Sequence, residues 1–256
     1  MTADLAAPPR PRPLETLNPL AKLAAPLPAM LALVFVRDLV APSLFLGAAL
    51  VVLLCGARFT PRTLTMLFVV VPAAVVVVSL GFAIWVDTDG LDATTPLVRI
   101  GDWTLTDGAL LTGLATGLRL AAIMTLAVIG GLTTTGADLV RALVQQLRVP
   151  YRIGYAALAA IRFVPRFAVE LRVIRQAHRV RGTRGPLRAA GYVVPLLASA
   201  IRHAERVALA MDARAFGAHR DRTERHLVPV RRRDVVFVLA FWVISVVILA
   251  LAGLAG

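Results

Sequence analysis

Long apolar runs alternate with polar segments along this chain of 256 residues. The runs Leu64–Val86, Ala109–Leu132 and Val235–Leu254 have the length that a helix needs to cross about 30 Å of hydrocarbon. Residues 20–56 hold two shorter runs, Leu20–Val36 and Leu39–Gly56. The shorter runs predict either two short spans or one bent span followed by a re-entrant piece.

The pattern becomes amphipathic between residues 133 and 234. A first helix is predicted over 136–147. A long helix follows over 151–181, bent at Pro165, with Gly182 and Gly185 as its stop and turn. Another is predicted over 187–216, bent at Pro195 with Gly217 as its C-cap. Their polar faces are rich in arginine, which suits helices that lie along a membrane interface.

The charge is as uneven as the hydropathy. The chain is 58% hydrophobic with a mean hydropathy of +0.77 and a net charge of +13. Residues 133–234 contain 20 arginines and seven acidic residues, while the basic and acidic residues elsewhere cancel. The positive-inside rule therefore places 133–234 in the cytoplasm, with the short loop of Arg58 and Arg62. The same rule places the acidic loop 87–107 outside the cell. It also places the basic N-terminus in the cytoplasm, which favours five spans over four.

These patterns predict an all-α membrane protein of about five transmembrane helices plus a cytoplasmic or interfacial domain of long bent helices. Residues 1–19 form a proline-rich, flexible tail. About four spans occupy 20–132. The basic domain covers 133–234, and the final span lies in 235–256.

Several chemistries are excluded or disfavoured. Cys55 is the only cysteine, so the chain has no disulfide framework. The four histidines lack metalloprotease spacing. Lys22 is the only lysine and stands between Ala21 and Leu23, whereas a P-loop needs Gly-Lys-Ser/Thr. The basic segment lies between apolar runs and lacks the side chains that bind bases, so a nucleic-acid partner is not expected.

Two arginines stand beside small residues at the ends of the long helical patterns. Arg181 precedes Gly182 in RQAHRVRG, and Arg214 lies between Ala213 and Ala215 in ERVALAMDARAFG. A lipid-facing surface does not need small neighbours, but a guanidinium that enters a protein groove does. The rigid donor fork of arginine suits carboxylates and carbonyls. The pattern favours docking into soluble partners, and simple contact with anionic lipid is the alternative.

Four further features lead to weaker expectations. Gly113 and Gly117 form a G-x-x-x-G pair, which permits close helix packing, although small residues are common throughout this chain. Arg119 lies deep in a span and must snorkel, pair with a carboxylate or face a polar interior. Arg166 and Glu170 are spaced for an ion pair. Arg141 is interpreted as a solvated or lipid-facing charge.

The basic domain resembles the transmembrane component T of energy-coupling factor transporters for vitamins and metals. The resemblance rests on LVQQLRVP, ALAAIRFVPRFAVELRVIRQAHRVRG and ERVALAMDARAFG in that order, followed by Arg222-Thr223. LNPLAKL is similar to the family's opening segment, with Asn18 in place of the usual aspartate. Val180 and Ala215 also depart from the usual residues.

The resemblance implies a non-catalytic coupling subunit in a prokaryotic cell membrane. Two cytoplasmic ATPases would each receive one helix end, at Val180-Arg181-Gly182 and at Ala213-Arg214-Ala215. The ATPases would bind ATP and magnesium, and this chain would bind no cofactor. Their motion would pass to a small substrate-binding membrane subunit for vitamin or metal-ion uptake.

Three other functional classes are alternatives. A membrane enzyme would have to use His178, His203, Glu170 or Asp212, and no nucleophile or metal motif supports them. A channel or secondary transporter would need ionisable residues in several spans. A conventional ABC permease that forms its own pathway is the nearest alternative, but it presents one coupling loop per chain, whereas this chain offers two helix ends.

Overall fold

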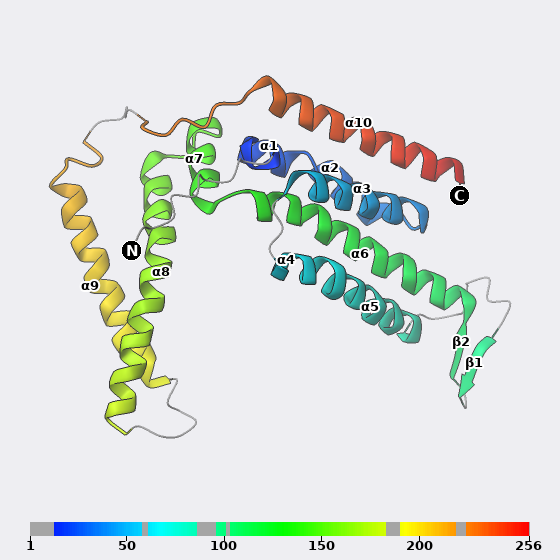
Figure 1. The fold of residues 1–256 in the computed structure, drawn as a ribbon, viewed down its shortest axis with the longest axis horizontal. Helices are drawn as coiled ribbons and strands as arrows, with labels where there is room; N and C mark the ends of the chain where they lie inside the picture. The colour runs from blue at the N-terminus through cyan, green and yellow to red at the C-terminus, as the bar shows by residue number, and fades with distance from the viewer. Residues whose placement is uncertain are drawn as a thin grey trace, which may run out of the picture. The chain divides into compact units, whose positions relative to one another are not determined.

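The computed structural model describes residues 13–57, 61–85, 96–100, 103–182, 190–218 and 224–255. Its helices gather into two compact units. The first comprises Met1–Thr135 with Pro229–Gly256, and the second comprises Gly136–Val228. The two units are described separately below, with the helix labels of Figure 1. The functional division at residues 19, 132 and 234 stays a prediction.

Prolines divide the first apolar run of unit 1 into two short helices. After a single helical turn at Pro13–Thr16 come α1 (Pro19–Ala24) and α2 (Leu27–Phe35), with a proline in the first turn of each. Proline is tolerated in a first turn because the N–H it lacks has no partner there. Then comes α3 (Val40–Gly56).

Three helical segments of the described chain are long and apolar enough to cross a membrane: Thr63–Trp85, Asp107–Thr133 and Arg232–Leu254. Two shorter apolar segments, Pro19–Phe35 and Val40–Gly56, lie before them. The helical membrane class is therefore confirmed. The choice between two short spans and one bent span for residues 20–56 remains open.

The first long segment is not a regular α-helix throughout. It starts as α4 (Pro61–Thr65), passes through a π-helical turn (Met66–Val70) and continues as α5 (Val71–Trp85). Pro72 has no N–H and therefore interrupts the series of backbone hydrogen bonds along the helix. The π-helical turn lies at this interruption.

Helix α6 (Asp107–Thr133) packs closely against α5 through two glycines. A Cβ at Gly113 would lie 2.3 Å from the carbonyl oxygen of Ser79, and one at Gly117 would lie 2.3 Å from Oγ of the same serine. The backbones can approach this closely only because both positions lack a side chain. The predicted G-x-x-x-G interface is confirmed, with α5 as its partner.

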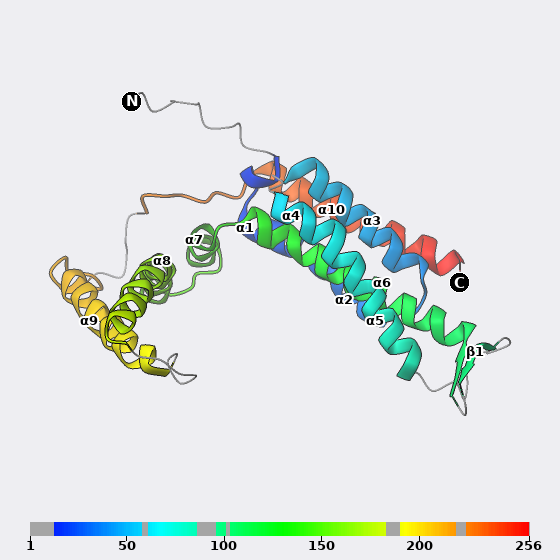
Figure 2. The ribbon, with the colours of Figure 1, turned by 60° about the horizontal axis from the view of Figure 1, so that its bottom comes forward.

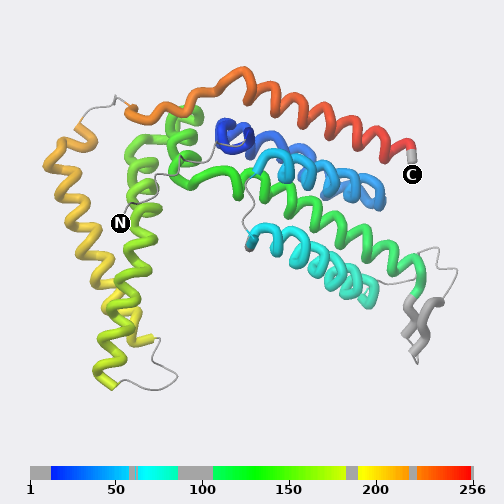
Figure 3. The backbone as a smooth tube through the Cα atoms, in the orientation of Figure 1, coloured from blue at the N-terminus to red at the C-terminus, as the bar shows by residue number. Residues whose placement is uncertain are grey.

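The last helix, α10 (Arg232–Ala255), lies beside the first ones, as Figure 3 shows in red and blue. The shared core includes Leu33, Phe45, Leu126 and Phe241. The start and the end of the chain thus build one helical unit.

A polar clasp closes this unit at the start of α10. Asp234 is 2% exposed and accepts hydrogen bonds from the backbone N–H groups of Asn18 (2.8 Å) and Arg231 (2.7 Å). Lys22, 1% exposed, donates from Nζ to the carbonyl oxygen of Thr133 at 2.6 Å. A cation is favourable there because the last carbonyls of α6 lack helical partners.

The acidic loop predicted over 87–107 contains a short antiparallel hairpin, β1 (Pro96–Ile100) with β2 (Trp103–Thr106). Val98, Ile100 and Trp103 are residue types that favour strands. Because acidic residues are frequent in the same segment, the sequence pattern indicated a polar loop instead. Thr106 caps α6, because its Oγ1 accepts from the N–H of Ala109. Asp87, Asp89, Asp92 and Asp102 lie outside the described residues.

Unit 2 consists of α7 (Gly136–Gln146), α8 (Tyr151–Val180) and α9 (Val193–Asp212). Figures 1 and 2 show α8 and α9 running side by side in opposite directions. Gly154 permits close contact with α7, since a Cβ there would lie 2.1 Å from Val144. The predicted helix over 151–181 is confirmed apart from its last residue, and it continues through Pro165.

The predicted start and bend of the next helix are wrong. Helix α9 begins at Val193, after a 3-10 turn over residues 190–192, so Pro195 lies in its first turn rather than at a bend. Proline needs no hydrogen-bond acceptor in that position. The helix also ends at Asp212, four residues before the predicted Phe216.

Candidate functional site

The first predicted triplet forms the exposed end of α8. Val180 is 89% exposed, and Arg181 and Gly182 are also exposed. The N–H of Arg181 donates to the carbonyl of Ala177 at 3.1 Å. Gly182 has a left-handed φ of +68° and no atom within 4 Å of where its Cβ would lie. The predicted helix stop at Gly182 is confirmed, whereas Gly185 lies outside the described residues.

The second triplet ends α9 in the same manner. Ala215 has a φ of +52°, its N–H donates to the carbonyl of Asp212 at 2.9 Å, and the N–H of Phe216 donates to Met211 at 3.0 Å. These two bonds form a Schellman motif, in which the left-handed position normally holds glycine. Ala213, Arg214 and Ala215 are all exposed. In both triplets, therefore, the arginine stands directly before a left-handed residue.

The two triplets lie at opposite ends of the helix pair. Phe216 packs edge-on against Tyr151 (5.7 Å between ring centroids) and Tyr155 (5.8 Å), so the end of α9 lies beside the start of α8. Arg152 donates to the carbonyl of Gly217 at 3.0 Å. The first triplet begins at Val180, the last residue of α8, and the 30 residues of that helix give about 45 Å at 1.5 Å per residue.

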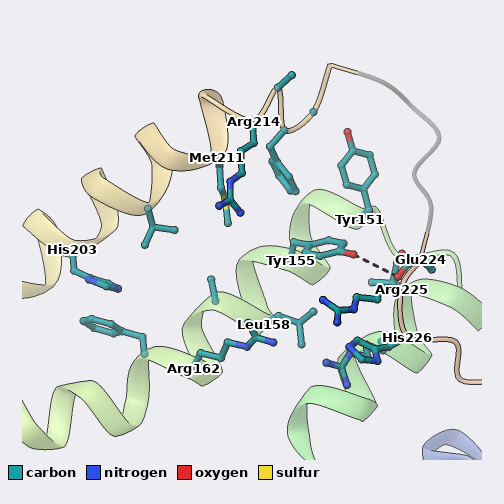
Figure 4. Close-up of a pocket in the computed structure, with 18 of the residues that line it drawn as sticks. Tyr151, Tyr155, Leu158, Arg162, His203, Met211, Arg214, Glu224, Arg225 and His226 are labelled. Carbon is teal, nitrogen blue, oxygen red and sulfur yellow. Dashed lines mark hydrogen bonds between the residues drawn. The ribbon is translucent and has the colours of Figure 1, made fainter.

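Arg214 also lines a groove inside unit 2, which we call the basic groove. It has a volume of about 1090 Å³ and lies between α8, α9, the end of α7 and the segment 224–226. Figure 4 shows Arg162 and Arg214 reaching it from the two long helices and Arg225 from the third segment. Within the described part of the chain, the arginines that line it are Arg141, Arg162, Arg166, Arg214 and Arg225.

The groove is strongly cationic because it has few acidic residues. Among the described residues of its lining, Glu224 is the one carboxylate, and its Oε2 lies 3.5 Å from the hydroxyl of Tyr155, which donates to it. No ion pair or hydrogen bond within the described chain engages the side chains of Arg162, Arg166, Arg214 or Arg225. Four guanidinium groups thus remain available to an anion.

Arg141 differs from its prediction as a solvated or lipid-facing charge. It pairs with Asp138 at 2.8 Å, and its side chain is 20% exposed. This ion pair forms because the two residues are three positions apart on one face of α7. The predicted pair of Arg166 with Glu170, in contrast, is not formed.

The two histidines considered for a membrane enzyme pack against aromatic rings. His203 stacks on Phe163 at 4.7 Å, and His178 meets Tyr192 edge-on at 5.1 Å. Glu170 is half-buried and Asp212 is exposed. Arg119 is half-buried in α6, and its Nε has no hydrogen-bond partner among the residues that the structure describes.

The sequence pattern missed the clasp of unit 1. The bonds between Asn18 and Asp234 and between Lys22 and Thr133 each join residues more than 100 positions apart, which no local pattern indicates. The signal that was available is a lone lysine in an otherwise apolar helix, which needs a buried partner. Arg222 and Thr223, which follow the second triplet in the resemblance, lie outside the described residues.

A comparison with protein families matches residues 11–225 to the family CbiQ, described as cobalt transport protein. Curated relatives include the energy-coupling factor transporter transmembrane protein EcfT of Thermotoga maritima, 32% identical over 54% of this chain and 56% of that protein. The transmembrane protein BioN of Rhizobium etli is 36% identical over 40% of this chain and 54% of that protein.

A third relative has a different name. An ABC transporter ATP-binding protein of Bifidobacterium longum is 27% identical over 93% of this chain, which corresponds to 32% of that protein. The chain thus spans about a third of this relative and little more than half of the other two.

Proposed function

Because this chain belongs to the CbiQ family of cobalt transport proteins, we propose that it is the membrane coupling subunit of an energy-coupling factor transporter. In this role it carries motion from two cytoplasmic ATPases to a small substrate-binding membrane subunit, for uptake of a vitamin or a metal ion. It is not an enzyme, and ATP and Mg²⁺ are bound by the ATPases. Unit 2 faces the cytoplasm of a prokaryotic cell.

One observation carries the proposal: the two long helices of unit 2, α8 and α9, each end in an exposed arginine that stands directly before a left-handed residue. A left-handed residue stops the helix abruptly and leaves the arginine at its tip. Small residues beside the arginine allow a partner's backbone to come close. A guanidinium there can donate several hydrogen bonds to carboxylates or carbonyls.

The separation of the triplets supports two partners rather than one. The length of α8, about 45 Å, exceeds the width of a typical interface of about 800 Å² per partner. Each helix end therefore suits a separate ATPase subunit. Val180 and Ala215 are compatible with this role, because both residues are exposed.

The names of the relatives support the same assignment. EcfT and BioN are named as transmembrane proteins of energy-coupling factor transporters. In the relative from Bifidobacterium longum, a segment similar to most of this chain belongs to a protein named for ATP binding. Both the transmembrane-protein names and the ATP-binding name are consistent with an ATPase as the partner of this chain.

The test is reversal of charge at both docking arginines. Arg181→Glu combined with Arg214→Glu should abolish co-purification of the ATPases in mild detergent, because each carboxylate would repel the acceptors that the arginine binds. The protein should still insert in the membrane, since neither side chain is buried. Mass spectrometry of the purified complex measures the ATPase content.

A matched control reverses the same amount of charge elsewhere on the same helices. Arg172→Glu with Arg202→Glu alters one exposed arginine of α8 and one of α9 outside the triplets. This variant should retain the ATPases. Full ATPase retention by the triplet variant would contradict the docking role. A second copy of this chain in place of a small membrane protein would favour a conventional permease.

A further inference from the structure

The basic groove has a composition that the docking of ATPases does not require. The docking triplets need an exposed arginine at each helix end, yet Arg162, Arg166 and Arg225 lie away from both ends and still line one cavity. They come from α8 and from the segment 224–226. A shared cationic cavity built from distant parts of a unit calls for its own explanation.

We propose that the basic groove binds the phosphate-bearing headgroup of an anionic phospholipid. Unpaired guanidinium groups bind phosphate oxygens through charge-assisted, often bidentate hydrogen bonds. Four arginines of the groove have no partner among the residues that the structure describes, and they outnumber the one described carboxylate of the lining, Glu224, which accepts a hydrogen bond from Tyr155. The groove therefore has a large uncompensated positive charge, and an anion is its complement.

The size and walls of the groove favour a lipid over a free phosphate ion. A volume of about 1090 Å³ matches sites that hold drug-sized ligands, and a lone phosphate would leave most of it empty. Aromatic rings of Tyr151, Tyr155, Phe163 and Phe216 form part of the lining. Tyrosine is enriched where one end of a site is apolar and the other is hydrated, as at lipid headgroups.

The same turns of α8 and α9 also expose aliphatic side chains. Ile161 is 38% exposed, Val164 is 67% exposed and Ile201 is 52% exposed. They lie within two residues of Arg162, Phe163 and His203, which line the groove. A phosphate site flanked by exposed aliphatic side chains fits a molecule that has both a charged head and acyl chains.

The segment that completes the groove is held in place. Gln145 of α7 donates to the carbonyl of His226 at 2.8 Å and accepts from the N–H of Val228 at 2.8 Å, while Gln146 donates to the carbonyl of Val228 at 2.8 Å. These three bonds fix the backbone that follows Arg225. The groove is thus preorganised rather than assembled from a loose connection.

The experiment is a titration of the purified full chain in detergent, with bound lipid counted by native mass spectrometry. The probes are short-chain phosphatidylglycerol, short-chain phosphatidylcholine and inorganic phosphate. The groove variant is Arg162→Gln with Arg166→Gln. The control is Arg172→Gln with Arg175→Gln, which removes the same charge from exposed positions of the same helix outside the groove.

The unaltered chain should bind phosphatidylglycerol more tightly than phosphatidylcholine. Each basic residue near an anionic lipid surface contributes roughly fivefold in affinity, so the groove variant should bind phosphatidylglycerol roughly 25-fold more weakly. The control should remain within about twofold of the unaltered chain, because Arg172 and Arg175 lie outside the groove that would hold the headgroup. Arg225→Gln, outside the helices, gives an independent variant should the double substitution impair folding.

Three results would overturn the proposal. Equal losses in the groove and control variants would mean diffuse attraction of lipid to the whole surface. Binding of inorganic phosphate with no retained phosphatidylglycerol would identify a site for free phosphate. Unchanged lipid binding together with loss of ATPases from the groove variant would make the groove a protein interface. The proposal does not depend on the docking role, because Arg181 and Arg214 are unaltered in every variant.

Discussion

At the scale of single residues, Ala215 is the position where local conformation and residue type disagree. Its φ of +52° is in the left-handed region, where a Cβ approaches a neighbouring carbonyl oxygen. Gly182 occupies the equivalent position after Arg181 without that strain. The sequence predicts Gly182 as a helix stop, but it identifies Ala215 only as a small residue beside an arginine. The left-handed backbone could not be predicted at Ala215, because alanine favours continuing the helix.

Ala215→Gly should stabilise the protein by about 1 kcal/mol, because glycine removes the steric penalty of the left-handed conformation. Ala213→Gly is the control, since Ala213 has a helical φ of −60°, and glycine there should destabilise by about 0.5–1 kcal/mol. Thermal unfolding of both variants in detergent measures the two effects. Equal shifts in the same direction would show that strain at Ala215 is not the cause.

At the scale of helices, the pattern of apolar positions predicted most elements of this fold. The runs gave α3, α6 and α10, and the arginine-rich amphipathic patterns gave α7 and α8. The hairpin β1–β2 and the true start of α9 were missed. Both lie where short-range signals compete, since strand-forming residues occur among acidic ones and Pro195 fits either a bend or a first turn.

The contact of α5 with α6 gives a prediction at this scale. Gly113→Ala should destabilise the protein by about 1–3 kcal/mol, because the new Cβ would clash with the backbone oxygen of Ser79 and force the helices apart. Gly131→Ala, in the same helix, has open space around it and should be neutral or slightly stabilising. The difference between their unfolding temperatures is the measurement. No difference would contradict close packing at Gly113.

At the scale of the whole chain, the two units differ in how far their contacts reach along the sequence. The clasp of unit 1 joins residues near the two termini, and the bond between Asn18 and Asp234 crosses 216 positions. Sequence periodicity says nothing about such pairs, so the clasp was not predicted. The two arginine triplets could be located from the sequence because each is local to one helix end; their docking role is a proposal. The groove was not, because its arginines come together only in the folded unit.

Removal of the clasp carboxylate tests this long-range contact. Asp234→Ala should destabilise the protein by about 2–3 kcal/mol, because two backbone N–H groups would lose their acceptor. Asp212→Ala, at an exposed carboxylate, should change stability by no more than about 0.5 kcal/mol. Urea or thermal unfolding of the detergent-solubilised chain compares the two variants. An effect of the same size at both positions would argue against the clasp.

The burial of Lys22 allows detachment of the first helix to be measured by chemical modification of the unaltered protein. It is the only lysine of the chain and is 1% exposed, with its amine against the carbonyl of Thr133. Amine-acylating reagents can therefore reach this side chain only when α1 opens away from the end of α6. Apart from Lys22, the α-amino group is the amine that such reagents acylate, so no second lysine interferes with the measurement of acylation at position 22. The rate of acylation at position 22, followed in membranes without any engineered label, reports how often the first helix of the bundle detaches.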